Sequence, residues 1–161
     1  MAFGNGVAGW RRFLGLSQNK PHKPIDVLRQ QYVDHMQQAA RLALHAAKMH
    51  YPQFREKLLE IGNDKKNSAE LIAQRLVAMG GTLPAVPEVL SSDENSWKQL
   101  GNALEEESRS ADRLEAQLRS IESDQPETIA LIQQICREHK THRDAIRHML
   151  MRSDPFAGSL A

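Results

Sequence analysis

The segment GGTLPAVPEVLSS at residues 80–92 decides how the chain is arranged, because it separates two long helical stretches by a connection that cannot itself be helical. It opens with two glycines and contains Pro84 and Pro87, and both residue types interrupt helices. When extended, residues 81–92 reach about 40 Å, close to the length of a helix of about 26 residues that rises about 1.5 Å per residue. This connection can therefore cross the whole length of a helical bundle.

Proline and glycine divide the rest of the chain into further helical stretches, all rich in Ala, Leu, Glu, Gln and Arg. We predict four helices, at about residues 25–50, 53–79, 93–122 and 126–152.

Each stretch has apolar residues at three- and four-residue spacing, which is typical of helices that pack in a bundle. In the third stretch this seam begins at Trp97 and continues through Leu100 and Leu104. The first and last connections are too short for anything but antiparallel hairpins. The sequence therefore predicts an all-α fold, a four-helix bundle at residues 25–152 with one long connection between its second and third helices.

Polar residues interrupt the four seams at one height. Measured from the two hairpin turns near residues 51 and 124, each interruption lies about four to five helical turns away. The predicted polar cluster consists of His35, Lys65, Ser68, Glu107, His139 and His142. Because an isolated buried polar group costs several kcal/mol, these side chains must pair with one another, with water or with a ligand.

Residues 68–84, SAELIAQRLVAMGGTLP, resemble the second helix of ferritin-like and rubrerythrin-like proteins. Those proteins typically have Glu-x-x-His-Ala-Glu there, followed by an apolar helix and a Gly-Gly-x-Pro end. The resemblance extends over residues 25–152 in the length and order of the helices. It implies a ferritin-like bundle.

The resemblance also implies where a metal centre would lie. In that family, a di-iron centre is held by a Glu on helices 1 and 3 and by Glu-x-x-His on helices 2 and 4. Carried over by position, helix 3 keeps its carboxylate as Glu107. Helix 4 has His139 in place of the Glu and keeps the following ligand as His142.

Helices 1 and 2 lack the family's ligands. Lys65 and Ser68 replace the Glu and the His of helix 2, and the nearest candidates on helix 1 are Tyr32 and His35. Two iron ions need several carboxylate oxygens, and one Glu cannot supply them. An ammonium at Lys65 would instead put a positive charge near the metal position and could pair with Glu107. The sequence thus disfavours a ferroxidase of the usual kind.

Two interpretations of the cluster remain open. In the first, it is a hydrogen-bonded network without a cofactor, and the protein is a non-ferroxidase binding or structural subunit. In the second, Glu107, His139 and His142 hold a single Fe, Mn or Zn ion, and the protein is a metal-binding oxidoreductase or a metal-storage protein. The positive charge of Lys65 favours the network without a cofactor.

Glu138 lies four residues before His142, and we expect that pair to form a surface salt bridge.

The two ends of the chain are predicted to lie outside the bundle. Residues 1–24 form a non-helical arm, and residues 153–161 form a flexible tail that faintly resembles the C-terminal tags by which ferritin-like cargo enters encapsulin shells. We expect the arm to dock on a protein partner; the alternatives are that it packs on its own bundle or lies on a membrane surface. The residues of the arm expected to make this contact are Phe3, Trp10, Arg11, Arg12, Phe13 and Leu14. Such bundles commonly assemble, so we also expect a homo-oligomer.

The amino-acid composition excludes several classes of function. The 161 residues include 21 basic and 20 acidic side chains and only 5% aromatic residues, which argues against binding to nucleic acid. A single cysteine allows no internal disulfide and no cysteine-based zinc site. The sequence contains no apolar run of the roughly 20 residues that a membrane span needs, and its beginning lacks the apolar core of a secretion signal. These features predict a cytoplasmic protein.

Overall fold

The computed structural model describes residues 22–122 and 124–153. The predictions for the aromatic residues of the arm and for the C-terminal tail fall outside these described residues. The helices are α2 (Pro24–Lys48), α3 (Pro52–Ala78), α4 (Ser96–Ser120) and α5 (Pro126–Arg152). Apart from one isolated bridge between His22 and Ile121, the described residues contain no β-structure. The predicted all-α fold is confirmed.

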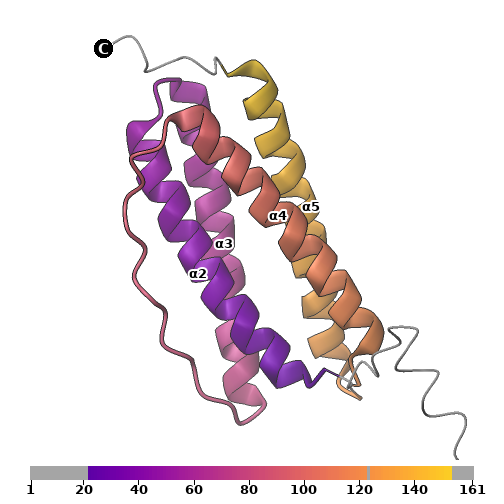
Figure 1. Cartoon of the computed structure of the whole chain (residues 1–161). Helices are drawn as coiled ribbons and strands as arrows, with labels where there is room; N and C mark the ends of the chain where they lie inside the picture. The colour runs from indigo at the N-terminus through magenta and orange to yellow at the C-terminus, as the bar shows by residue number, and fades with distance from the viewer. Residues whose placement is uncertain (1–21, 123, 154–161) are drawn as a thin grey trace, which may run out of the picture.

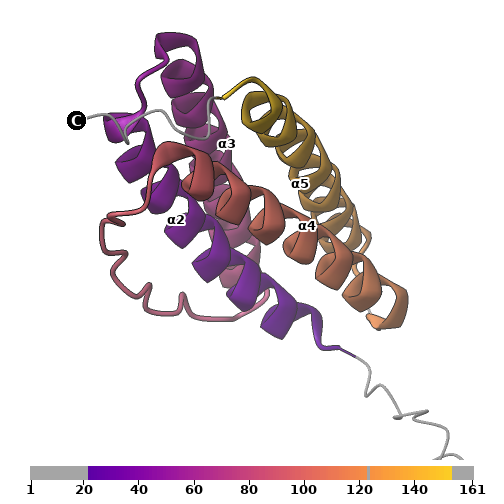
Figure 2. The ribbon, with the colours of Figure 1, turned by 45° about the horizontal axis from the view of Figure 1, so that its top comes forward.

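The helices form two antiparallel hairpins, α2 with α3 and α4 with α5 (Figure 1). The hairpins meet where α2 contacts α4 and where α3 contacts α5. From the end of α3 the chain runs back along the outer side of α2, so that α4 begins at the end of the bundle where α3 also begins (Figures 1 and 2). This connection crosses the whole bundle, as residues 80–92 predict.

A glycine cap ends α3 and starts this connection. Gly80 has a φ of 78°, a left-handed conformation that glycine adopts without a steric penalty. Its N–H donates to Val77 O at 2.9 Å, and the N–H of Gly81 donates to Leu76 O at 2.8 Å. These two bonds satisfy carbonyl groups that the helix end would otherwise leave unpaired.

The start of α4 differs from the prediction of residue 93. The Asn95 side chain accepts a 2.8 Å hydrogen bond from the backbone N–H of Lys98, which fixes the first residue of the helix as Ser96. Ser92 instead accepts a hydrogen bond from the backbone N–H of Glu94 and forms a turn before the helix. Trp97 therefore lies in the first turn and is 40% exposed, so its predicted place in the buried seam is wrong.

The apolar core consists of two clusters, one toward each end of the bundle. The first cluster contains Leu42, Ala46, Met49, Phe54, Leu58, Ile61, Leu100, Ile146 and Met149. The second contains Val27, Leu28, Ile72, Leu76, Leu114, Ile132, Ile135 and Cys136. On every helix, the residues between the two clusters include buried polar side chains.

In the described part of the chain, no helix is both long and apolar enough to cross a membrane.

Candidate functional site

A layer of polar side chains lies between the two apolar clusters. Each of its six predicted members is at most 4% exposed. These residues are His35, Lys65, Ser68, Glu107, His139 and His142. Because the seams of all four helices are interrupted at the same height, the helices bring these side chains to the middle of the bundle.

An ion pair between α3 and α4 forms the centre of the layer. Lys65 Nζ lies 2.7 Å from Glu107 Oε1 and 2.9 Å from Glu107 Oε2. His139 on α5 completes the group, with its Nδ1 2.7 Å from Glu107 Oε2. A carboxylate can only accept, so this contact puts a proton on Nδ1. The 3.1 Å contact between Lys65 Nζ and His139 Nδ1 is then one between two donors that share the same carboxylate.

Helix α2 supplies the fourth side of this centre. The amide oxygen Oε1 of Gln31 lies 3.4 Å from His139 Nε2, on the ring edge opposite Glu107, and with the His139 proton on Nδ1 this is a contact between two acceptors. His35 packs edge-on against the His139 ring, with the ring centroids 5.1 Å apart, and its Nδ1 lies 2.8 Å from the backbone oxygen of Gln31. Polar side chains from all four helices, two of them from α2, therefore take part in a single continuous set of contacts.

Ser68 and His142 belong to the layer but pair toward its edge. The Ser68 hydroxyl donates to Glu138, and His142 Nε2 lies 3.2 Å from Asp64 Oδ2. Glu138 also accepts a 2.9 Å hydrogen bond from Gln134. The expected surface pair of Glu138 with His142 is thus replaced by two contacts between α3 and α5. Glu138 and His142 lie one helical turn apart on α5, and each of them bonds to a residue of α3 instead of to the other.

Burial and charge determine the protonation of these groups. Burial raises the pKa of Glu107, but the His139 hydrogen bond and the positive charge of Lys65 outweigh it, so the pKa lies below its ordinary value. Burial lowers the pKa of Lys65, and Glu107 partly offsets this effect. Burial together with the nearby Lys65 charge lowers the pKa of His35 and of His142. The layer thus has a carboxylate at Glu107 and neutral imidazoles at His35 and His142.

These donors do not fit a di-iron centre. Glu107 is the single carboxylate among the six predicted side chains, and both of its oxygens already accept hydrogen bonds from Lys65 or His139. By the resemblance of the sequence, the helix-2 carboxylate of such a centre would correspond to Lys65, which is not a metal ligand while it is bonded to Glu107. Among residues 22–122 and 124–153, no three His, Cys, Asp or Glu side chains are arranged to hold one metal ion. Of the three residues predicted as ligands of a single metal ion, Glu107 and His139 are in contact with each other, whereas His142 is bonded to Asp64.

Sequence comparison agrees with the arrangement of the helices. The family model of the ferritin-like domain matches residues 26–153. This match covers most of the chain, so the protein belongs to the ferritin-like domain family. A search of the curated proteins finds no match.

Sequence reasoning missed three buried polar residues of this region. Gln31 lies four residues before His35 and Gln38 three residues after it, so both share its helix face. Ser110 lies three residues after Glu107, and its hydroxyl accepts a 3.4 Å hydrogen bond from Gln38 Nε2. That spacing from a predicted polar position is the signal that could have identified them.

Proposed function

We propose that this protein is a non-ferroxidase member of the ferritin-like family that works as a binding or structural subunit. The observation that supports this most is the ion pair in the bundle centre, where Lys65 Nζ lies 2.7 Å from Glu107 Oε1 and the two side chains are 1% and 3% exposed. In this proposal the pair takes the place of the di-iron centre, and the protein needs no cofactor.

The charge of the amine supports the proposal. A divalent cation about 4 Å from an ammonium is repelled by about 8 kcal/mol when the effective dielectric constant is about 20. Glu107 already balances the charge of Lys65 and cannot balance that of a metal ion as well. Binding a metal here would require Lys65 to lose its proton or to leave the core.

The position of the pair supports a structural role. Lys65 on α3 and Glu107 on α4 come from different hairpins, and His139 on α5 bonds to the same carboxylate. In an iron-loaded bundle, shared metal ligands would join the helices at this height. Here direct hydrogen bonds would do so and keep the two hairpins in register.

Contacts with other molecules are assigned to the ends of the chain. We propose that residues 1–24, through Trp10 and the residues beside it, or residues 153–161 bind a protein partner, and that the bundle forms a homo-oligomer. The aromatic content of the arm supports this assignment, because exposed aromatic groups commonly dock against another surface. A cytoplasmic location belongs to the same proposal and agrees with a lone cysteine, Cys136, that is free and buried.

Metal content tests the proposal. The protein is purified without chelator, incubated with ferrous, manganous or zinc ions, desalted and analysed for metal per chain. We expect substoichiometric metal and no acceleration of ferrous oxidation over buffer. About one ion per chain, lost in both Glu107→Gln and His142→Ala, would instead establish the single-metal oxidoreductase or storage protein. In that experiment His148→Ala, at an exposed position on α5, is the matched control.

A further inference from the structure

An open groove of about 610 Å³ lies between α3 and α5, in the half of the bundle where α3 ends and α5 begins. Residues of these two helices line it, and no other described segment covers it. Leu71 on its wall is 42% exposed. The other apolar residues that line it are Ala78, Ala130 and Leu131. This apolar surface is therefore open to a further segment of protein.

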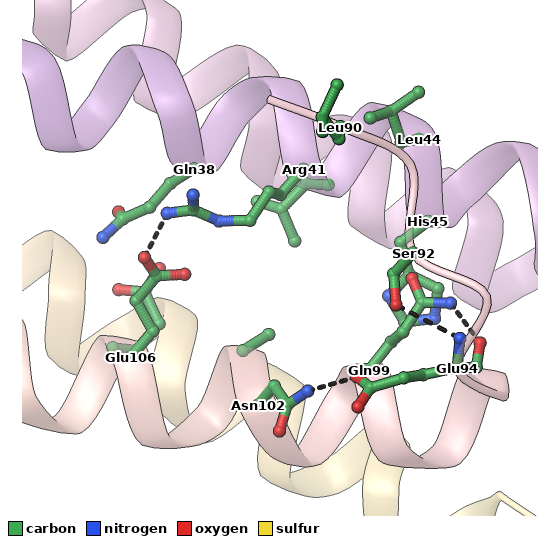
Figure 3. A pocket seen from close by; sticks show the side chains of 13 residues that line it. Gln38, Arg41, Leu44, His45, Leu90, Ser92, Glu94, Gln99, Asn102 and Glu106 are labelled. Atoms are coloured by element: carbon green, nitrogen blue, oxygen red, sulfur yellow. Dashed lines mark hydrogen bonds and ion pairs between the residues drawn. The ribbon is translucent and has the colours of Figure 1, made fainter. Parts of the chain in front are cut away.

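The pocket on the opposite side of the bundle, between α2 and α4, is already covered (Figure 3). The long connection passes over it and contributes Ser92 to its wall. Arg41 forms an ion pair with Glu106, and Asn102 Nδ2 donates to Glu94 Oε2 at 2.7 Å. Because the polar groups of this pocket bond to one another beneath a cover, the groove between α3 and α5 is the better docking surface.

We propose that the N-terminal arm of the same chain docks into the groove between α3 and α5, with Trp10 as its main anchor. This proposal rests on the proposed function and adds a regulation to it, because residues that lie in the groove cannot bind a protein partner at the same time. A partner has to displace the arm from its own bundle, so the docked arm is autoinhibitory.

The composition of the arm fits an apolar groove. Residues 3–16 include one tryptophan, two phenylalanines, two leucines and one valine, and they include no acidic residue. Each aromatic side chain buries about 150–250 Å² of surface when it packs. Removing this apolar area from water drives the segment onto the exposed leucine and alanine side chains of the groove.

The charged residues at the rim of the groove also suit the arm. Glu127 is 73% exposed and lies 3.6 Å from Arg75, so its carboxylate remains open to the side chain of Arg11. Arg137 makes no ion pair among the described residues, and its guanidinium can lie against the indole of Trp10. The rim thus offers one contact to the basic residues of the arm and one to its anchor.

The arm begins at the end of the bundle where the groove also begins. His22 forms a bridge with Ile121 just after α4, and α2 follows from Pro24. Residues 15–21 reach about 24 Å when extended, whereas neighbouring helices lie only about 10 Å apart. Residues 17–20 are polar, with the sequence SQNK, which suits an exposed passage around this end. The anchor can therefore reach its own groove, where the short tether gives it an effective concentration on the order of 1 mM.

Acrylamide quenching of Trp10 fluorescence in the full chain tests the docking. Trp97→Phe, at a 40% exposed position on α4, leaves Trp10 as the only tryptophan. With an intrinsic dissociation constant on the order of 0.1 mM, about nine in ten arms are docked. Trp10 should then be quenched several-fold less than free tryptophan. This protection should survive dilution, because docking within one chain does not depend on concentration.

Two double variants locate the site. Leu71→Glu with Ala130→Glu places two charges in the groove and should weaken docking about a hundredfold, which leaves about one arm in ten docked. Leu59→Glu with Ala116→Glu makes the same two changes at exposed positions outside the groove. This matched control should leave the protection of Trp10 unchanged.

A labelled peptide of residues 3–16 tests the autoinhibition. It should bind full-length Trp10→Ala, whose own arm has lost its anchor, about tenfold more tightly than it binds the unmodified chain. It should not bind the variant with Leu71→Glu and Ala130→Glu.

Four results would each overturn the proposal. Trp10 could be quenched as readily as free tryptophan, or the two double variants could behave alike. Exposure of Trp10 on about hundredfold dilution would mean that the arm of a second copy fills the groove. Equal binding of the peptide to Trp10→Ala and to the unmodified chain would mean that the arm does not occupy the groove. None of these results depends on metal content, so this proposal and the proposed function fail separately.

Discussion

Lys65 is 1% exposed, and an ammonium at that depth is stable because the Glu107 carboxylate, whose Oε1 lies 2.7 Å from Nζ, supplies a compensating charge. Removing two charges from water is expensive, and their attraction in the core roughly repays the cost. The pair therefore adds little stability in itself, but losing one member leaves an uncompensated charge in the core.

Glu107→Gln should lower the free energy of unfolding by about 3–5 kcal/mol, because Lys65 then stays buried without a counter-charge. The double variant Lys65→Met with Glu107→Leu removes both charges and should fall within about 1 kcal/mol of the unmodified protein. Chemical denaturation of the two variants measures both values.

Lys57→Met is the matched control, since the Lys57–Glu60 pair lies on the surface and should change the free energy of unfolding by less than about 0.5 kcal/mol. If Glu107→Gln is no more harmful than this control, the Lys65 amine reaches solvent and the central ion pair does not exist.

The buried histidines make stability depend on pH. His35 and His142 have pKa values lowered from 6.5 in the folded protein, so below pH 6.5 the unfolded chain binds more protons than the folded one. Stability is then fully present above pH 6.5 and falls as the pH drops toward the folded pKa values, by up to about 1.4 kcal/mol per pH unit for each histidine.

His35→Gln should flatten this loss between pH 7 and pH 5, whereas His148→Gln at an exposed position should leave it unchanged. Denaturation at several pH values measures both profiles. An unchanged slope in His35→Gln would mean that His35 gains a proton in the folded protein as easily as in the unfolded one.

The sequence predicts the candidate residues better than their partners. Lys65 and Glu107 interrupt apolar seams, and the spacing of those interruptions along each helix can be read from the sequence alone. The partners of Ser68 and His142 depend on which side chains of a neighbouring helix face them, and a seam pattern does not contain that information. Gln31 was missed because glutamine is common on exposed helix faces.

At the scale of the elements, the end of α3 determines the direction of the crossing connection. A Cβ added to Gly81 would lie 2.8 Å from Ile25 Cδ1 and 3.1 Å from Leu76 O. The backbone of the connection thus passes close to the first turn of α2, and a side chain at this position would push it away.

Gly81→Ala should lower stability by about 1–3 kcal/mol, through this overpacking. Gly101→Ala on α4 is the control, because a Cβ there meets no atom within 4 Å and alanine favours the helix by about 0.5–1 kcal/mol. Thermal unfolding should therefore move in opposite directions in the two variants. A neutral Gly81→Ala would contradict the close passage over Ile25.

The long elements are predictable because proline, glycine and apolar spacing mark them along the sequence. The exact ends of these helices are harder to predict. Two candidate caps, Ser92 and Asn95, precede α4, and the choice depends on how the connection arrives from the other end of the bundle. That choice also decides the exposure of Trp97.

At the scale of the whole molecule, the polar layer divides the core into two apolar clusters. All four helices contribute residues to the polar layer and to each of the two clusters. The Lys65–Glu107–His139 group is bonded within one chain, whereas Gln31 Nε2, His35 Nε2 and His142 Nδ1 have no hydrogen-bond partner among the described residues. Because this layer is buried inside the bundle, we expect association with other chains to depend on segments outside this core.

Deleting residues 1–20 should leave the midpoint of thermal unfolding unchanged within a few degrees, because the core contacts lie within the described residues. If the arm mediates association, native mass spectrometry should show a smaller particle than for the full chain. An unchanged particle mass would remove the arm from the association surface and leave the tail or the bundle faces.

Anomalous diffraction from crystals soaked in excess ferrous or manganous ions tests the central claim most directly, because it places any bound metal and the Lys65 side chain in the same map. We predict no anomalous peak between the four helices and a Lys65 amine within hydrogen-bond distance of Glu107. A pair of metal peaks at that position, or one metal bound by Glu107, His139 and His142 with the amine turned away, would contradict the account.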